Sequence, residues 1–226
     1  GRLQVVAFLG DRAVGLDPDR GTPIWKYPYK TDYDCNIATP LLHKGRVFLS
    51  AGENHGSVML ELKKTGTGLV PSVAWQTQGP RAQMRNEWQT SILLGGFLYG
   101  MDNVGGAGPI THLGCLNATT GKLAWKTDRG EFPRNYCSPV IWNVGPSKQV
   151  IVAATLRVVG YDLKSGKELW TVRGLSRAVC NTPVVGGDGK LYVAGWARGG
   201  DIDERISVEP FAKLAAARDK NNNGTL

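Results

Sequence analysis

The chain is a series of short apolar runs separated by glycine, proline and small polar residues. Four stretches share one plan, in which a small polar residue and usually a proline precede an apolar strand, a glycine-rich turn and a second apolar strand. They are residues 35–52, 88–103, 136–155 and 179–196. The runs are short and rich in β-branched and aromatic residues, which favours strands. Glycine and proline recur too often for paired helices, so the pattern predicts hairpins of short strands.

A second pattern recurs between these stretches: an aspartate or asparagine, a glycine four residues later, and a tryptophan four residues after that. The copies are Asp17–Gly21–Trp25, Asn117–Gly121–Trp125 and Asp162–Gly166–Trp170. The Asx side chain can accept a backbone N–H two residues on, and glycine supplies the positive φ of the reversal. A looser copy with a lengthened turn ends on Trp75. Each copy is expected to be a turn followed by a strand that closes on its tryptophan.

The two patterns combine into a unit of four strands that repeats along the chain. Repeats of about 40–50 residues with four strands each are typical of β-propeller blades. An indole at one fixed place per unit is expected to pack between adjacent sheets, whereas one cofactor would need only one stacking platform. A single β-sandwich is the alternative, but it gives no reason for periodic tryptophan. The sequence therefore predicts an all-β fold, a partial β-propeller of four-stranded antiparallel blades, about four blades plus part of a fifth.

The Asx–Gly–Trp frame, together with Ser or Thr and Pro before an apolar strand, resembles the PQQ-like repeat over about residues 4–196. This is the repeat of quinoprotein alcohol dehydrogenases and of the outer-membrane assembly lipoprotein BamB. Propellers of that family have more blades than this chain supplies, so the resemblance implies that the remaining blades of the same propeller are missing. We expect two parts, residues 1–200 as propeller blades and residues 201–226 as an inserted segment.

The last residues, ARDKNNNGTL, carry an oxygen-bearing side chain at every second position. An EF-hand loop takes side-chain oxygens at positions 1, 3 and 5, glycine at position 6 and a backbone carbonyl at position 7. The stretch 208–218 reads as the short C-terminal helix that would enter such a loop. The alternative is a polar tail. Position 12 lies beyond the last residue and only one ligand is a carboxylate, so we expect weak Ca2+ binding or none. The predicted calcium ligands are Asp219, Asn221, Asn223 and Thr225.

Charge and cysteine spacing narrow the function classes. The formal charge is +8, but Lys and Arg are scattered with no run longer than a pair, which argues against nucleic-acid binding. No apolar run reaches the roughly 18 residues of a membrane-spanning helix. Cys35, Cys115, Cys137 and Cys180 lack the spacing of metal ligands. Three of them (35, 137 and 180) occupy equivalent positions just before apolar strands, so we expect small-residue fillers, most of them too far apart to form disulfides. A redox role near the axis of the ring is the alternative.

Five polar residues precede the apolar strands where side chains would face the centre of a ring: Asp32, Asp34, Asn36, Glu87 and Asn181. A quinoprotein dehydrogenase needs a stacked quinone, an Asp base and Ca2+ held by Glu, Asn and Asp, and the resemblance assigns none of these roles here. The usual role of such residues is to cap strands and turns.

The expected function is therefore a non-catalytic scaffold of the bacterial cell envelope that offers its loops to a protein partner or small ligand, with Ca2+ ordering the insert. PQQ-like propellers with an inserted EF-hand are exported, so the resemblance implies a periplasmic or outer-membrane-associated protein. The alternative is a fragment of a PQQ-dependent alcohol or sugar dehydrogenase, with PQQ as its cofactor.

Overall fold

The computed structural model describes residues 3–195, apart from residues 53–54, 67, 105–110, 130–135 and 177–178. Contacts divide the chain into two units, Gly1–Trp196 and Ala197–Leu226, and every described residue belongs to the first. The helix expected over residues 208–218 and the calcium loop that follows it lie outside the described residues.

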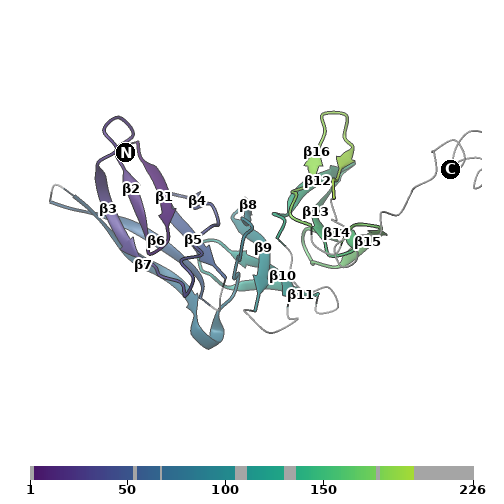
Figure 1. Ribbon diagram of the computed structural model, residues 1–226, viewed down its shortest axis with the longest axis horizontal. Helices are drawn as coiled ribbons and strands as arrows, with labels where there is room; N and C mark the ends of the chain where they lie inside the picture. The colour runs from purple at the N-terminus through teal and green to yellow at the C-terminus, as the bar shows by residue number, and fades with distance from the viewer. Residues whose placement is uncertain are drawn as a thin grey trace, which may run out of the picture. The chain divides into compact units, whose positions relative to one another are not determined.

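The described strands form antiparallel sheets in which neighbouring strands follow one another along the chain (Figure 1). The first sheet contains β1 (Val5–Leu9), β2 (Arg12–Leu16) and β3 (Pro23–Pro28). The second contains β4 (Leu41–His43), β5 (Arg46–Ala51), β6 (Gly56–Thr65) and β7 (Gly68–Gln78). A short 3-10 turn, η1 (Gly79–Arg81), follows the second sheet.

Two further four-stranded sheets and a short hairpin complete the series. The third sheet contains β8 (Ile92–Leu94), β9 (Phe97–Asn103), β10 (Thr111–Asn117) and β11 (Leu123–Asp128). The fourth contains β12 (Val140–Val144), β13 (Ser147–Ala154), β14 (Arg157–Asp162) and β15 (Glu168–Arg173). The fifth contains β16 (Val184–Val185) and β17 (Leu191–Tyr192). These four-stranded meanders confirm the predicted all-β, partial-propeller fold.

The core lies between consecutive sheets, which explains why the middle strands are apolar without alternation. Almost every residue of β9 and of the second half of β13 is buried, because both faces of the sheet are covered by neighbours. Met101 and Leu113 of the third sheet pack against Val152 and Val159 of the fourth. Equivalent clusters join the first sheet to the second and the second to the third.

The three Asx–Gly turns have the predicted chemistry. In the third sheet, Asn117 Oδ1 accepts the backbone N–H groups of Thr119 and Thr120, each at 3.0 Å, and the N–H of Gly121 donates to the Asn117 carbonyl at 2.8 Å. Asp17 and Asp162 make the same contacts with the residues two and three positions on. The turn glycines have φ angles of +64° to +70°, the left-handed region that glycine tolerates best.

Each repeated tryptophan lies inside the last strand of its sheet, opposite a residue of the third strand. The opposed pairs are Gly15–Trp25, Met59–Trp75, Cys115–Trp125 and Gly160–Trp170, and in each last strand a β-bulge lies directly before the tryptophan. The expectation that the strand closes on its tryptophan is wrong, because three more residues pair after it in every sheet. The bulge lets the ladder regain its register.

Two of the tryptophans span adjacent sheets as expected. The Trp75 indole N–H donates to the carbonyl of Ala118 in the third sheet at 3.0 Å, and its ring covers Gly121, where a Cβ would lie 2.6 Å from ring carbons. Trp125 repeats this one sheet further on: its N–H donates to the Leu163 carbonyl at 3.2 Å and its ring covers Gly166. The tryptophan of one sheet thus packs on the turn glycine of the next.

The other two tryptophans lie over their own sheet, which the sequence did not indicate. Trp25 covers Gly15 and donates to Gln4 Oε1 at 2.7 Å. Trp170 covers Gly160 and donates to Gln149 Oε1, also at 2.7 Å. The residue opposite these indoles is glycine, so the ring can lie flat against the backbone, whereas the side chains of Met59 and Cys115 occupy that space in the second and third sheets.

Candidate functional site

The segments before the first strand of each sheet carry the candidate functional residues. We call residues 36–40, 87–91, 136–139 and 179–183 the lead-in segments; they precede β4, β8, β12 and β16. The backbone N–H of Thr39 donates to Thr90 Oγ1 at 3.0 Å, and the N–H of Thr90 donates to Ser138 Oγ at 2.9 Å. All three residues stand two positions before a strand, so a ladder of hydroxyls ties successive sheets together. This gives the recurring Ser or Thr before proline a structural reason.

Large side chains stand four residues before the first strand of the second, third and fourth sheets. Ile37, Trp88 and Tyr136 stand there, and Ile37 and Trp88 are 53% and 49% exposed. The rings of Trp88 and Tyr136 stack with centroids 4.4 Å apart and planes 27° from parallel. An exposed tryptophan stacked on a half-buried tyrosine of the neighbouring segment is typical of a surface that binds other molecules. We call Trp88 and Tyr136 the aromatic pair.

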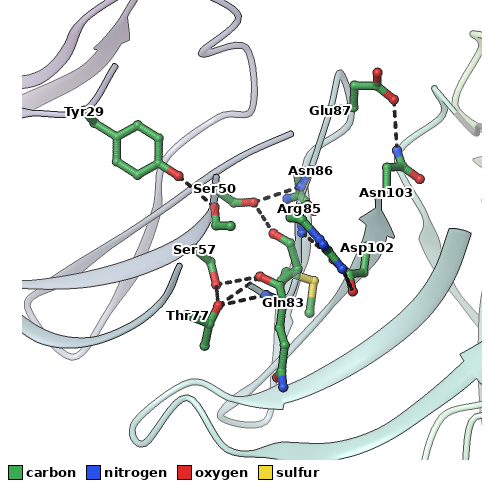
Figure 2. A network of polar contacts seen from close by, with 12 residues as sticks. Tyr29, Ser50, Ser57, Thr77, Gln83, Arg85, Asn86, Glu87, Asp102 and Asn103 are labelled. Carbon is green, nitrogen blue, oxygen red and sulfur yellow. Dashed lines mark hydrogen bonds and ion pairs between the residues drawn. The ribbon is translucent and has the colours of Figure 1, made fainter. Parts of the chain in front are cut away.

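A buried ion pair holds the connection between the second and third sheets. Arg85 Nε and Nη2 contact the two carboxylate oxygens of Asp102 at 2.6 and 2.9 Å, and the backbone N–H of Arg85 donates to the same carboxylate at 3.1 Å. Asp102 belongs to β9 and is 3% exposed. Figure 2 shows Arg85 against Asp102, with Glu87 facing Asn103 beside them. The two-pronged geometry fixes the orientation of the connection as well as its charge.

Hydroxyl groups of the second sheet bind the same connection from its other side (Figure 2). Ser50 donates to the Met84 carbonyl and accepts the N–H of Asn86 at 3.0 Å. Ser57 and Thr77 both donate to the Gln83 carbonyl at 3.0 Å. Met84 has a φ of +54°, a strained conformation that persists only where surrounding contacts enforce it. The connection is therefore held rigidly just before the aromatic pair.

The predicted polar candidates do not gather into one site. The Asn36 amide is buried and donates to the carbonyls of Leu9, Gly10 and Tyr29, and Glu87 accepts from the Asn103 amide at 3.4 Å. Both side chains thus cap strands and connections, which is the role expected for them. Asp32, Asp34 and Asn181 are exposed.

Two carboxylates of this region make contacts within the chain. Glu87 accepts a hydrogen bond from the Asn103 amide at 3.4 Å, and Asp102 pairs with Arg85. Across the described ranges, no three His, Cys, Asp or Glu side chains are grouped as metal ligands. No described helix is long and apolar enough to cross a membrane. The predicted calcium ligands Asp219, Asn221, Asn223 and Thr225 lie outside the described residues.

The cysteines depart partly from expectation. All four are described and none forms a disulfide. Cys115 and Cys137 are buried, and burial raises the pKa of their thiols to about 11 and about 12. Cys180, however, is exposed and Cys35 is half-buried.

The three cysteines expected to be equivalent are not. Cys137 stands three residues before β12, and Ala38 and Gln89 stand at the same distance before β4 and β8. Cys35, by contrast, lies six residues before β4, and Cys180 lies four residues before β16. Only Cys137 fills the buried slot, because the register of each strand, and not its mere proximity, decides which residue turns inward.

Sequence reasoning missed the Arg85–Asp102 pair, the hydroxyl ladder and the aromatic pair. The recurrence of Ser or Thr before proline was visible, and aligning the units on the first residue of each strand would have placed Trp88 and Tyr136 together. Nothing local indicated that Arg85 and Asp102 would meet, because 17 residues separate them.

Comparisons with known proteins agree with the fold. The family model of outer membrane protein assembly factor BamB matches residues 103–197, less than half of the chain. BamB from Moraxella catarrhalis superposes with a TM-score of 0.52 at 18% identity, covering 78% of this chain and 50% of BamB. A comparison with curated protein sequences found no match.

Two quinohemoprotein alcohol dehydrogenases are similar in the same sense. The enzyme from Comamonas testosteroni gives a TM-score of 0.58 at 12% identity, covering 83% of this chain and 37% of the enzyme. ADHIIG from Pseudomonas putida HK5 gives 0.51 at 13%, covering 76% and 33%. The chain spans half or less of each of these proteins, and the likeness shows that they share the β-propeller fold.

Proposed function

We propose that this chain is part of a non-catalytic β-propeller scaffold of the bacterial cell envelope, and that its lead-in segments bind a protein partner through Ile37 and the aromatic pair. The observation that carries the proposal is the stack of the exposed Trp88 on the half-buried Tyr136, with ring centroids 4.4 Å apart. Aromatic residues are enriched in protein interfaces and dominate their binding energy.

The surroundings of the aromatic pair suit a binding platform. The hydroxyl ladder ends on Thr90 and Ser138, each two residues after one ring of the pair. The Arg85–Asp102 ion pair fixes the backbone three residues before Trp88. A side chain that is already held in place loses little conformational entropy on binding. The pair therefore offers apolar area at low entropic cost.

Two further observations support a scaffold in preference to an enzyme. Asn36, Glu87 and Asp102 are used to close strands and connections. One of the similar proteins is by name an outer membrane protein assembly factor, which supports a protein partner and an exported, periplasmic or outer-membrane-associated location. Ca2+ bound by Asp219, Asn221, Asn223 and Thr225 would then order the inserted segment.

Site-specific photo-crosslinking in the native bacterium tests the partner. A photoreactive amino acid replaces Trp88, and a matched control carries it at Leu169, which is 48% exposed on β15. We expect a discrete protein adduct in the envelope fraction from position 88 and none from position 169. Equal labelling from both positions, or no adduct from position 88, would contradict the proposal.

An enzyme assay tests the alternative function, a PQQ-dependent dehydrogenase. The full-length protein is incubated with PQQ and Ca2+ and tested for dye-linked oxidation of alcohols and sugars. Turnover that requires PQQ would replace the scaffold proposal. Calcium binding is tested separately by titration calorimetry on the full-length protein, with Asp219→Ala as control. A binding isotherm identical in both proteins would remove the EF-hand from the proposal.

A further inference from the structure

A fully buried arginine lies between the third and fourth sheets. Arg129 directly follows β11, is 2% exposed, and is anchored by its backbone N–H on the Thr111 carbonyl at 2.9 Å. Its side chain lies beside Met101 of β9 and Tyr161 of β14. A charged side chain is almost never this deeply buried unless it is paired.

The groups around Arg129 leave three of its five N–H donors without a hydrogen-bond partner. Nη1 faces only the Met101 sulfur, at 3.9 Å, and the guanidinium carbon lies 5.8 Å from the centre of the Tyr161 ring. Nε and Nη2 have no hydrogen-bond partner, nor has the Tyr161 hydroxyl, although Tyr161 is completely buried. The nearby Glu168 carboxylate is 3.8 Å from Arg157, so it pairs with a different cation.

The unused edge has a definite chemical preference. Nε and Nη2 are the two parallel donors with which a guanidinium grips the two oxygens of one carboxylate. A thioether and an aromatic face compensate only weakly for removing the charge from water. One uncompensated positive charge matches a singly charged carboxylate better than a phosphate dianion, which would leave excess negative charge buried.

We propose that the Nε–Nη2 edge of Arg129 and the hydroxyl of Tyr161 form a carboxylate-binding site between the third and fourth sheets. The carboxylate accepts two hydrogen bonds from the guanidinium and one from the phenol. This site is independent of the partner surface at the lead-in segments. Its carboxylate comes from a separate small molecule.

Thermal unfolding of the 226-residue chain in formate tests the site. Formate, the smallest carboxylate, replaces chloride at constant ionic strength. The variants are Arg129→Met, which keeps volume and removes charge, and Tyr161→Phe, which removes only the hydroxyl. The exposed Arg20→Met serves as the control for loss of a positive charge.

One pattern supports the proposal. The midpoint rises with formate, and Arg129→Met and Tyr161→Phe reduce or abolish the rise while Arg20→Met keeps it.

Two outcomes of the midpoint measurements would overturn the proposal. An arginine buried without any anion is better replaced by an apolar residue, so a midpoint that is higher in Arg129→Met than in the parent even at the highest formate concentration would mean that no carboxylate binds. The same conclusion follows if formate leaves the midpoint of the parent unchanged. Should Arg129→Met fail to fold, Tyr161→Phe decides: an unchanged or higher midpoint with an unaltered response to formate refutes the site.

Discussion

Replacing the turn glycines by alanine measures how much the tryptophans contribute to packing between sheets. Gly21 and Gly121 occupy the same position of the same Asx–Gly turn, with φ angles of +64° and +70°. A Cβ on Gly21 would have no atom within 4 Å, whereas a Cβ on Gly121 would lie 2.6 Å from two carbons of the Trp75 ring. The two substitutions therefore share one backbone cost and differ only in the contact with the indole.

The expected losses of stability follow from the backbone cost and the contact with the indole. Holding alanine in the left-handed region costs about 1–2 kcal/mol, which is the whole expected effect of Gly21→Ala. Gly121→Ala adds the cost of overpacking, about 1–3 kcal/mol, since the ring must move and its hydrogen bond to the Ala118 carbonyl stretches. The total is about 2–5 kcal/mol, a large part of the stability of a typical domain.

Urea unfolding followed by tryptophan fluorescence gives the free energies, and a double-mutant cycle isolates the contact. Trp75→Leu removes the bulk above the turn, so Gly121→Ala in that background should cost only as much as Gly21→Ala does in the parent. Gly166→Ala, which meets Trp125 in the next sheet, should behave like Gly121→Ala.

Equal costs at positions 21 and 121 would refute the reasoning. Such a result would mean that Trp75 does not rest on the turn of the third sheet and that the indoles do not hold the sheets together. A cycle with no coupling between positions 75 and 121 would lead to the same conclusion.

Three further predictions concern the core and the lead-in segments. Trp125→Ala should cost about 3–5 kcal/mol in urea unfolding, the range for a large side chain removed from a core, and a midpoint equal to that of the parent would contradict its role. Asp102→Asn should cost about 3 kcal/mol because Arg85 is left without its carboxylate, whereas Glu61→Gln at the exposed Arg46 pair should cost under about 1 kcal/mol; similar losses would contradict this. Burial raises the pKa of the Cys137 thiol to about 12 from 9.0, so the folded state keeps a proton that the unfolded state loses above pH 9.0. The stability present below pH 9.0 should therefore fall as the pH rises towards 12, and Cys137→Ala should make urea midpoints fall less steeply above about pH 9. An unchanged slope would argue against a buried thiol.

The turns were predictable because their chemistry is local. Asn117 needs only the residues up to Gly121 to form its hydrogen bonds, and the frame is visible in the sequence. The sheets followed from the same signal, because a short reversal between apolar runs leaves few alternatives to antiparallel pairing.

The lead-in segments were only partly predictable because their contacts join different sheets. Thr39 and Thr90 are 51 residues apart in sequence, and no local pattern states that a backbone N–H of one unit meets a hydroxyl of the next. The cysteines show that residues in similar sequence contexts can also differ in burial. Cys35, Cys137 and Cys180 look alike in sequence because each precedes an apolar run, but burial depends on the distance to the first paired residue.

The orientation of each tryptophan depends on two positions that belong to different sheets. Trp75 and Trp125 rest on a short Asx–Gly turn in the sheet that follows, and Met59 or Cys115 stands opposite the indole. The sheet that follows Trp25 has a long β6–β7 hairpin instead, and a Cβ added to Gly66 near the end of that hairpin would meet no atom within 4 Å.

Without a neighbouring turn to rest on, the Trp25 indole needs room above its own sheet, and Gly15 supplies that room while Gln4 accepts its N–H. A lengthened turn in one unit thus goes with glycine opposite the tryptophan of the preceding unit. Gly15→Cys should therefore be poorly tolerated even though Cys115 occupies the equivalent position in the third sheet, because the indole displaced from Gly15 would have no turn glycine to cover.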